Sequence, residues 1–143
     1  MDRGYIPVVN SGEHLIRIRS PGRPLDEEAI RSLRAALSVC PDLAFAHLVD
    51  CEVEGVSGER NLSLFVWLMP EGVKSLRGSL NLVSEVVAGA IPQDRCVDIL
   101  ILNSAPELLA DVEHAGCLFV ERDPVERSRA IAALQAGDHP GTP

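Results

Sequence analysis

The segment from Asn61 to Met69 constrains the fold more than any other part of the sequence, because its residues divide into two strand faces that are both largely apolar. Side chains alternate across a β-strand, so every second residue shares a face. One face comprises Leu62, Leu64, Val66 and Leu68, and the other comprises Ser63, Phe65, Trp67 and Met69. The first face should pack under helices, and the second should stand on the open side of a sheet.

Predicted strands and helices alternate along the rest of the chain. Further strands are expected at 14–19, 43–54, 96–102 and 117–121, and helices are expected after Asp26, Pro70, Ser104 and Asp123. The order is β-α-β-β-α-β-α-β-α, and its first six elements follow the split βαβ pattern of ferredoxin-like folds. Right-handed crossovers would place the first two helices on one face of the sheet.

This order predicts one α/β domain over residues 1–143, with a core at about 14–136 and a flexible tail at 137–143. We expect an α+β two-layer sandwich with a mixed five-stranded sheet, in which a ferredoxin-like core carries an added helix and strand.

The clearest helical signal follows Pro70. Apolar residues recur there at intervals of three and four, which places them on one stripe of a helix. The stripe comprises Val73, Leu76, Leu80, Val83, Val87 and Ala90. We therefore expect one continuous helix that ends before Pro92.

Charge and hydropathy limit the kinds of partner. The formal net charge of −8 argues against a nucleic-acid duplex or an anionic membrane as the main partner, because both need clustered positive charge. No apolar run approaches the roughly 18 residues of a membrane span, and Met1 to Asn10 lack a signal-peptide pattern. We therefore predict a cytoplasmic protein whose four cysteines are reduced thiols.

Short catalytic motifs are missing from the sequence: it contains no phosphate-binding loop, no dinucleotide-binding glycine pattern and no zinc-protease motif. His114 and Cys117 lie three residues apart, so they can form a thiolate–imidazolium pair or serve as a helix-end cation and a small apolar residue. We predict no catalytic residues and no cofactor, although enzymatic activity stays open.

An acidic row offers a second candidate site. Asp50, Glu52 and Glu54 share a strand face, with Glu59 in the loop that follows. Several oxygens in one place suit a divalent cation, but such a row more often lies in solvent and discourages edge pairing. We predict no metal site here.

The predicted open face is the strongest candidate for function. Phe65, Trp67 and Met69 are expected there as apolar anchors, with Arg17 and Arg19 beside them as a charged rim. Aromatic, methionine and arginine side chains are enriched in interface cores, so this face predicts a homodimer and a possible second protein partner. Two alternatives stay open: the last two helices cover this face, or a small ligand stacks on Trp67 and pairs with Arg17 or Arg19.

The run from Ile30 to Asp50, IRSLRAALSVCPDLAFAHLVD, resembles the C-terminal domain of the enhanced serine sensitivity protein family, SseB. The later VDILIL stretch and the segment from Gly116 to Phe119 are similar to the closing strands of that domain. The resemblance covers most of residues 14–122. The family's closing strand usually carries a tyrosine, which Cys117-Leu118-Phe119-Val120 lacks, and the family usually has a preceding N-terminal domain, which we do not expect here.

The resemblance implies a bacterial cytosolic domain that acts as an interaction or regulatory module, and it implies no catalytic mechanism. We therefore predict a non-enzymatic protein-interaction module. A small-molecule sensor or enzyme that uses the open sheet face is one alternative. An acidic partner resembling a secretion chaperone is another.

Overall fold

The structure is a computed structural model that describes residues 16–53 and 60–135. Residues 1–15, 54–59 and 136–143, which include the predicted tail, lie outside this description. None of the helices in the described part of the chain has the length and apolar character that a membrane crossing requires.

The described residues form a mixed α/β structure with five strands, which confirms the predicted fold class. The strands are β1 (Ile16–Arg19), β2 (Leu43–Val53), β3 (Arg60–Leu68), β4 (Asp98–Ile101) and β5 (Leu118–Glu121). The helices are α2 (Glu27–Leu37), α3 (Pro70–Lys74), α4 (Leu76–Ala90), α5 (Leu109–Ala115) and α6 (Pro124–Gln135), and two short 3₁₀ turns, η1 (Leu102–Ser104) and η2 (Pro106–Leu108), precede α5.

The long strand β2 organises the sheet. One edge of β2 pairs with β3, and its other edge pairs with β1 near one end and with β5 near the opposite end. β4 pairs parallel with β3 and completes the order β1-β2-β3-β4. A ferredoxin-like sheet would place the first strand between β3 and β4. The predicted ferredoxin-like order is therefore wrong, because β4 pairs directly with β3 and leaves β1 on the far edge of β2.

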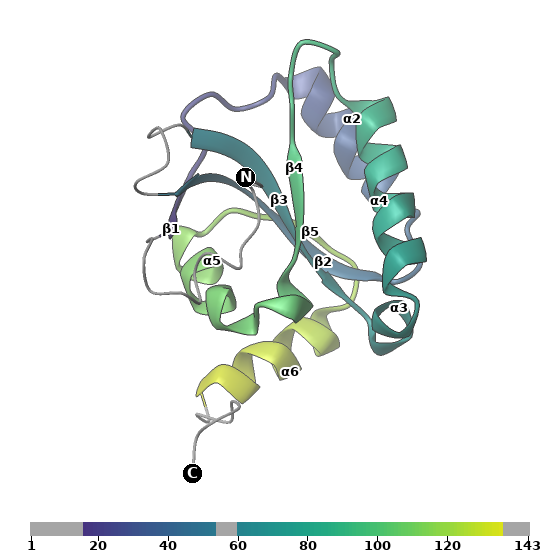
Figure 1. Cartoon of the computed structure of the whole chain (residues 1–143), viewed down its shortest axis with the longest axis vertical. Helices are drawn as coiled ribbons and strands as arrows, with labels where there is room; N and C mark the ends of the chain where they lie inside the picture. The colour runs from purple at the N-terminus through teal and green to yellow at the C-terminus, as the bar shows by residue number, and fades with distance from the viewer. Residues whose placement is uncertain (1–15, 54–59, 136–143) are drawn as a thin grey trace.

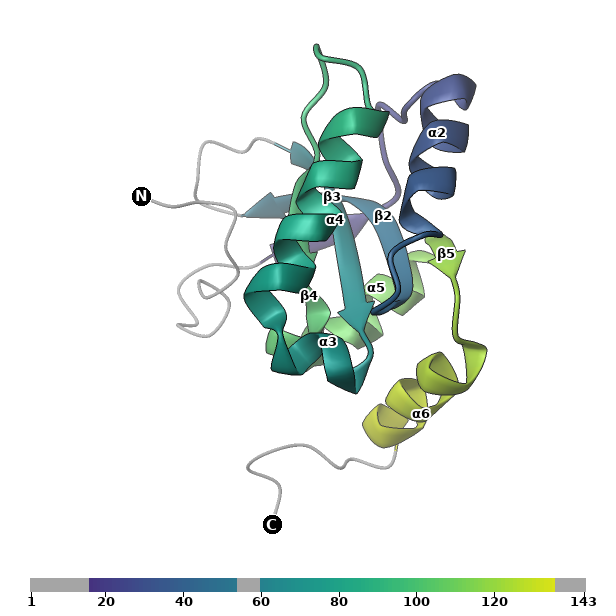
Figure 2. The same cartoon turned by 90° about the vertical axis from the view of Figure 1, so that its right-hand side faces the viewer.

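Helices cover both faces of the sheet (Figures 1 and 2). α2 and α4 pack side by side on one face, as predicted, and enclose a core that includes Leu33, Leu64 and Val83. The turns η1 and η2 and the helices α5 and α6 lie against the other face, where Phe45 and Phe65 are buried. The predicted two-layer sandwich is thus replaced by three layers, with helices on each side.

Local sequence signals set several helix ends. The side chain of Asp26 accepts a hydrogen bond from the Ala29 amide at 2.8 Å, so it caps α2 as predicted. Asp123 caps α6 in the same way, through the Glu126 amide at 2.9 Å. Gly116 ends α5 with a φ of 71°, a left-handed conformation that glycine adopts without strain.

The helix expected after Pro70 is broken in two at Ser75. Gly72 packs so closely against Asp42 that an added Cβ would lie 2.7 Å from the Asp42 Cβ. The Ser79 hydroxyl donates to the Gly72 carbonyl and fixes this approach. Val73 and Leu76, at the start of the predicted stripe, are consequently exposed, whereas Val83 and Val87 are buried as expected.

Candidate functional site

The side chains of β3 divide between two faces as the sequence predicts, but the second face is covered rather than open. Leu64 and Val66 lie in the core beneath α2 and α4, whereas Phe65 lies in the core beneath α5 and α6. Phe65 is only 1% exposed, so it cannot anchor a partner on the surface. Trp67 and Met69 pack against the same core and keep partial exposure. The chain's own last helices therefore cover this face, as one of the open alternatives expected.

Arg17 and Arg19 do not join Phe65 and Trp67. Ile18 lies opposite Cys51 in the sheet and packs, like Cys51, on the α5–α6 side. Because neighbours along a strand point to opposite faces, Arg17 and Arg19 project from the α2–α4 side of the sheet. Arg19 contacts Glu52 across the strand pair at 3.7 Å. The predicted placement of both arginines beside Trp67 is wrong.

Trp67 is held in a fixed orientation by two contacts. Its indole ring stacks on Phe45, with ring centroids 5.9 Å apart and planes inclined by 8°. Its Nε1–H donates to the Glu126 carboxylate on α6 at 3.0 Å. Glu126 is buried, and its second oxygen accepts from Arg129 one turn later on α6. These two contacts therefore fix the orientation of a partly exposed tryptophan ring.

A cavity of about 720 Å³ lies beside Trp67, between the 3₁₀ turns and α6. Its apolar wall comes from Trp67, Pro106, Leu109, Ala130, Ala133 and Leu134, and its polar lining comes from Ser104, Glu107, Glu126 and Arg129. Glu107, Arg129 and Ala133 are exposed, so they lie where the cavity meets solvent. Cavities of roughly 300–1,000 Å³ with apolar walls and a few fixed polar groups are the usual sites for small molecules.

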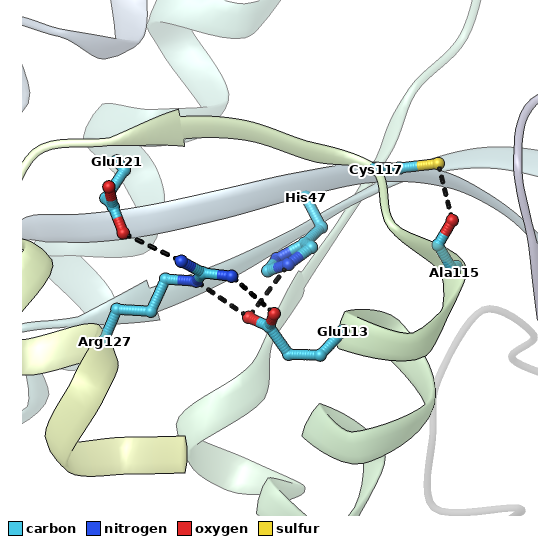
Figure 3. Close-up of polar contacts among 6 residues, drawn as sticks. All are labelled: His47, Glu113, Ala115, Cys117, Glu121 and Arg127. Atoms are coloured by element: carbon cyan, nitrogen blue, oxygen red, sulfur yellow. Dashed lines mark hydrogen bonds and ion pairs between the residues drawn. The ribbon is translucent and has the colours of Figure 1, made fainter.

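A partly buried polar network attaches α6 to the sheet. Figure 3 shows Glu113 of α5 between His47 of β2 and Arg127 of α6. His47 Nε2 lies 3.1 Å from a Glu113 oxygen, and Arg127 donates to both Glu113 oxygens, at 2.6 and 2.9 Å. Arg127 also donates to Glu121 of β5 at 3.0 Å. These paired hydrogen bonds raise the pKa of Arg127, so the guanidinium stays protonated.

His47 is the least solvated member of the network, with 1% exposure. Burial lowers its pKa, and this outweighs the opposite effect of Glu113. Among the described residues its Nδ1 atom has no hydrogen-bond partner, so a second proton would find no acceptor there. His47 is consequently a neutral ring that donates from Nε2 and connects β2 to α5.

Of the two interpretations of His114 and Cys117, the thiolate–imidazolium pair is not assembled. His114 is exposed, and the Cys117 sulfur points toward the Ala115 carbonyl oxygen at 3.4 Å (Figure 3). Burial raises the pKa of Cys117, which is opposite to the shift that a reactive thiolate needs. Burial likewise raises the pKa of Cys51 to about 11. Cys51 and Cys117 therefore behave as small apolar residues, which for Cys117 is the second of the two interpretations.

The acidic row is used in ordinary contacts. Asp50 is buried and accepts from the Gly22 amide at 2.9 Å, and Glu52 contacts Arg19. Glu54 and Glu59 lie outside the described residues. Within residues 16–53 and 60–135, no three histidine, cysteine or acidic side chains lie close enough to hold a metal ion.

No protein-family model, curated protein or solved structure shows significant similarity to this chain. The resemblance to the SseB C-terminal domain therefore stays a prediction. The predicted homodimer also stays a prediction, and it has lost the open face on which it depended.

Sequence reasoning found Trp67 but missed Glu126, Arg127 and His47. The backbone amide of Glu126 donates to Asp123, and its side chain accepts from Trp67, 59 residues earlier in the chain. One sequence signal could have indicated these contacts. The helix α6 has arginines and glutamates among few large apolar residues, and such a helix needs polar partners in order to pack. This signal does not say which strand supplies them.

Proposed function

We propose that this chain is a small-molecule-binding regulatory module whose ligand site is the cavity beside Trp67. The single observation that carries the proposal is the position of Trp67, which borders an apolar cavity while Phe45 and Glu126 hold its ring. A binding site whose side chains are already fixed loses less conformational entropy when a ligand arrives.

The chemistry of the lining supports binding rather than catalysis. Among the described residues that line the cavity, Ser104 carries the one hydroxyl group, and no histidine or cysteine accompanies it. A serine nucleophile needs a base within hydrogen-bond reach. Of the remaining polar groups, Glu126 and Arg129 are engaged with Trp67 and with each other, and Glu107 is exposed where the cavity meets solvent.

The test uses the fact that Trp67 is the single tryptophan of the sequence. In a ¹⁵N-labelled sample, one indole N–H signal reports on this cavity. Addition of 2-naphthylmethanol, a neutral aromatic probe, should shift that signal in a saturable manner. If the signal stays unchanged up to the solubility limit of the probe, the proposal is wrong.

Two neighbouring alanines on α6 provide a matched pair of variants. Ala133 lines the cavity, whereas Ala132 is exposed and lies outside its lining. Ala133→Phe should fill the cavity and remove the response to the probe, while Ala132→Phe should bind as the unsubstituted chain does. Thermal unfolding of both variants serves to check that each retains the fold. Equal loss of binding in the two variants would contradict the proposed site.

A further inference from the structure

The charges around the Trp67 cavity do not cancel. Its lining contains two carboxylates, on Glu107 and Glu126, and one cation, on Arg129. Glu126 and Arg129 form an ion pair one turn apart on α6. One negative charge, that of Glu107, is left over.

Glu107 lies on η2, across the cavity from α6, and its side chain is exposed. Among the described residues it makes no hydrogen bond or ion pair, whereas Glu126 uses both of its oxygens. The other arginine near this part of α6, Arg127, already contacts Glu113 and Glu121. Among the described residues, Glu107 is therefore the one unpaired carboxylate of the cavity lining.

The apolar part of the lining favours the carbon atoms of a ligand. Trp67, Pro106, Leu109, Ala130 and Leu134 offer surface that a ligand covers with carbon atoms rather than with charge. A tryptophan ring in the wall also attracts nearby cations through its π electrons, and it offers nothing comparable to an anion. The free carboxylate and the indole ring thus favour the same charge on the ligand.

We propose that the ligand of this cavity is an amphipathic amine, an aromatic or aliphatic body that carries one ammonium group, with the ammonium at Glu107 and the apolar body against Trp67. This inference rests on the proposed binding function and adds the chemical class of the ligand. It also predicts that anionic aromatic molecules are poor ligands.

Three probes of nearly equal size test the inference: 2-naphthylmethylamine, 2-naphthylmethanol and 2-naphthoate, which are cationic, neutral and anionic at pH 7. Titrations follow the Trp67 indole N–H signal of the full chain. The amine should bind roughly fivefold more tightly than the alcohol, as expected for one partly exposed ion pair, and the acid should bind most weakly. Added salt should reduce the advantage of the amine and leave the affinity for the alcohol unchanged.

The variant Glu107→Gln separates charge from shape. It should bring the affinity for the amine to that for the alcohol and leave the affinity for the alcohol as it was. As a control, Glu85→Gln removes an exposed carboxylate of α4 that does not line the cavity, and the preference for the amine should persist.

Each result bears on one of the two proposals. If the alcohol binds but the amine has no advantage, or if the acid binds best, the cavity is a ligand site and the inferred ligand class is wrong. If none of the three probes shifts the indole signal, both the binding function and the ligand class are wrong.

Discussion

The two faces of the sheet are covered by helices of different character. α2 and α4 cover one face with 11 and 15 residues, and their contact with the sheet is a row of leucine and valine side chains. α6 covers part of the other face, and its first two turns are attached mainly by hydrogen bonds that Glu126 accepts and Arg127 donates. Apolar side chains pack closely and leave little empty space between a helix and a sheet, whereas hydrogen bonds can hold a helix at a greater distance from the sheet. The cavity lies on the side where a helix is attached by hydrogen bonds.

This comparison predicts that α2 and α4 contribute more to the free energy of unfolding than α6 does. Regions with fewer buried apolar contacts open at a lower free-energy cost than the rest of a protein.

Truncation of the α2 core should cost the most. Leu33 is fully buried between α2 and the sheet, so Leu33→Ala should lower the free energy of unfolding by about 3 kcal/mol. Leu134 on α6 is partly exposed and already borders a cavity, so Leu134→Ala should cost about 1 kcal/mol or less. Urea unfolding of both variants measures the difference. Similar losses at the two positions would remove the distinction between the faces.

Loss of Glu113 should separate α6 from α5. Glu113→Ala leaves the buried His47 ring and the Arg127 guanidinium without their shared acceptor, so we expect a loss of about 2 kcal/mol in the free energy of unfolding. Glu121→Ala removes the other carboxylate that contacts Arg127, but Glu121 lies at the surface and should cost about 0.5 kcal/mol. Hydrogen exchange should show faster exchange in α6 for the first variant. If α2 and α4 lose protection equally, the network does not act on α6 locally.

Acid should weaken the same face through His47. Burial lowers the pKa of His47 in the folded chain, so the unfolded chain binds its proton more readily. Full stability is therefore expected above the unfolded pKa of about 6.5, and stability should fall as the pH drops from there toward the folded pKa. The groups that face the ring are Glu113 from α5 and Arg127 from α6.

The variant His47→Gln isolates this contribution, because glutamine can donate to Glu113 but does not titrate. Thermal unfolding between pH 5 and 7.5 should show a smaller pH dependence for this variant than for the unsubstituted chain. An unchanged pH dependence would mean that other groups control the acid response.

The sequence predicted the face beneath α2 and α4 better than the face with the cavity. Alternation in β3 and the apolar stripe of α4 sorted Leu64, Val66, Val83 and Val87 correctly, because burial under long helices follows a simple period. The same alternation placed Phe65 and Trp67 on the second face, but whether α5 and α6 fold across that face depends on contacts between residues far apart in the chain. The Trp67–Glu126 hydrogen bond is one such contact.

Strand order was also beyond local sequence signals. The element order β-α-β-β-α-β is compatible with more than one sheet, and a period of two residues does not reveal which edges pair. β1 has four residues and pairs at the far end of β2, next to Asp50 and Cys51, so it lies away from Trp67. The error in placing Arg17 and Arg19 has the same origin, since a shift of one residue in register reverses the face of every side chain.

The last prediction concerns two glycines, one in α3 and one in α4. Gly78 on α4 is exposed, and a Cβ there would have no neighbour within 4 Å, so Gly78→Ala should raise the free energy of unfolding by about 0.5 kcal/mol through helix propensity. Gly72 on α3 is the contrasting case, because a Cβ there would lie 2.7 Å from the Asp42 Cβ. Gly72→Ala should therefore lower the free energy of unfolding. Urea unfolding gives both signs, and a gain in stability at Gly72 would show that α3 can move away from Asp42, so that tight packing does not extend to α3.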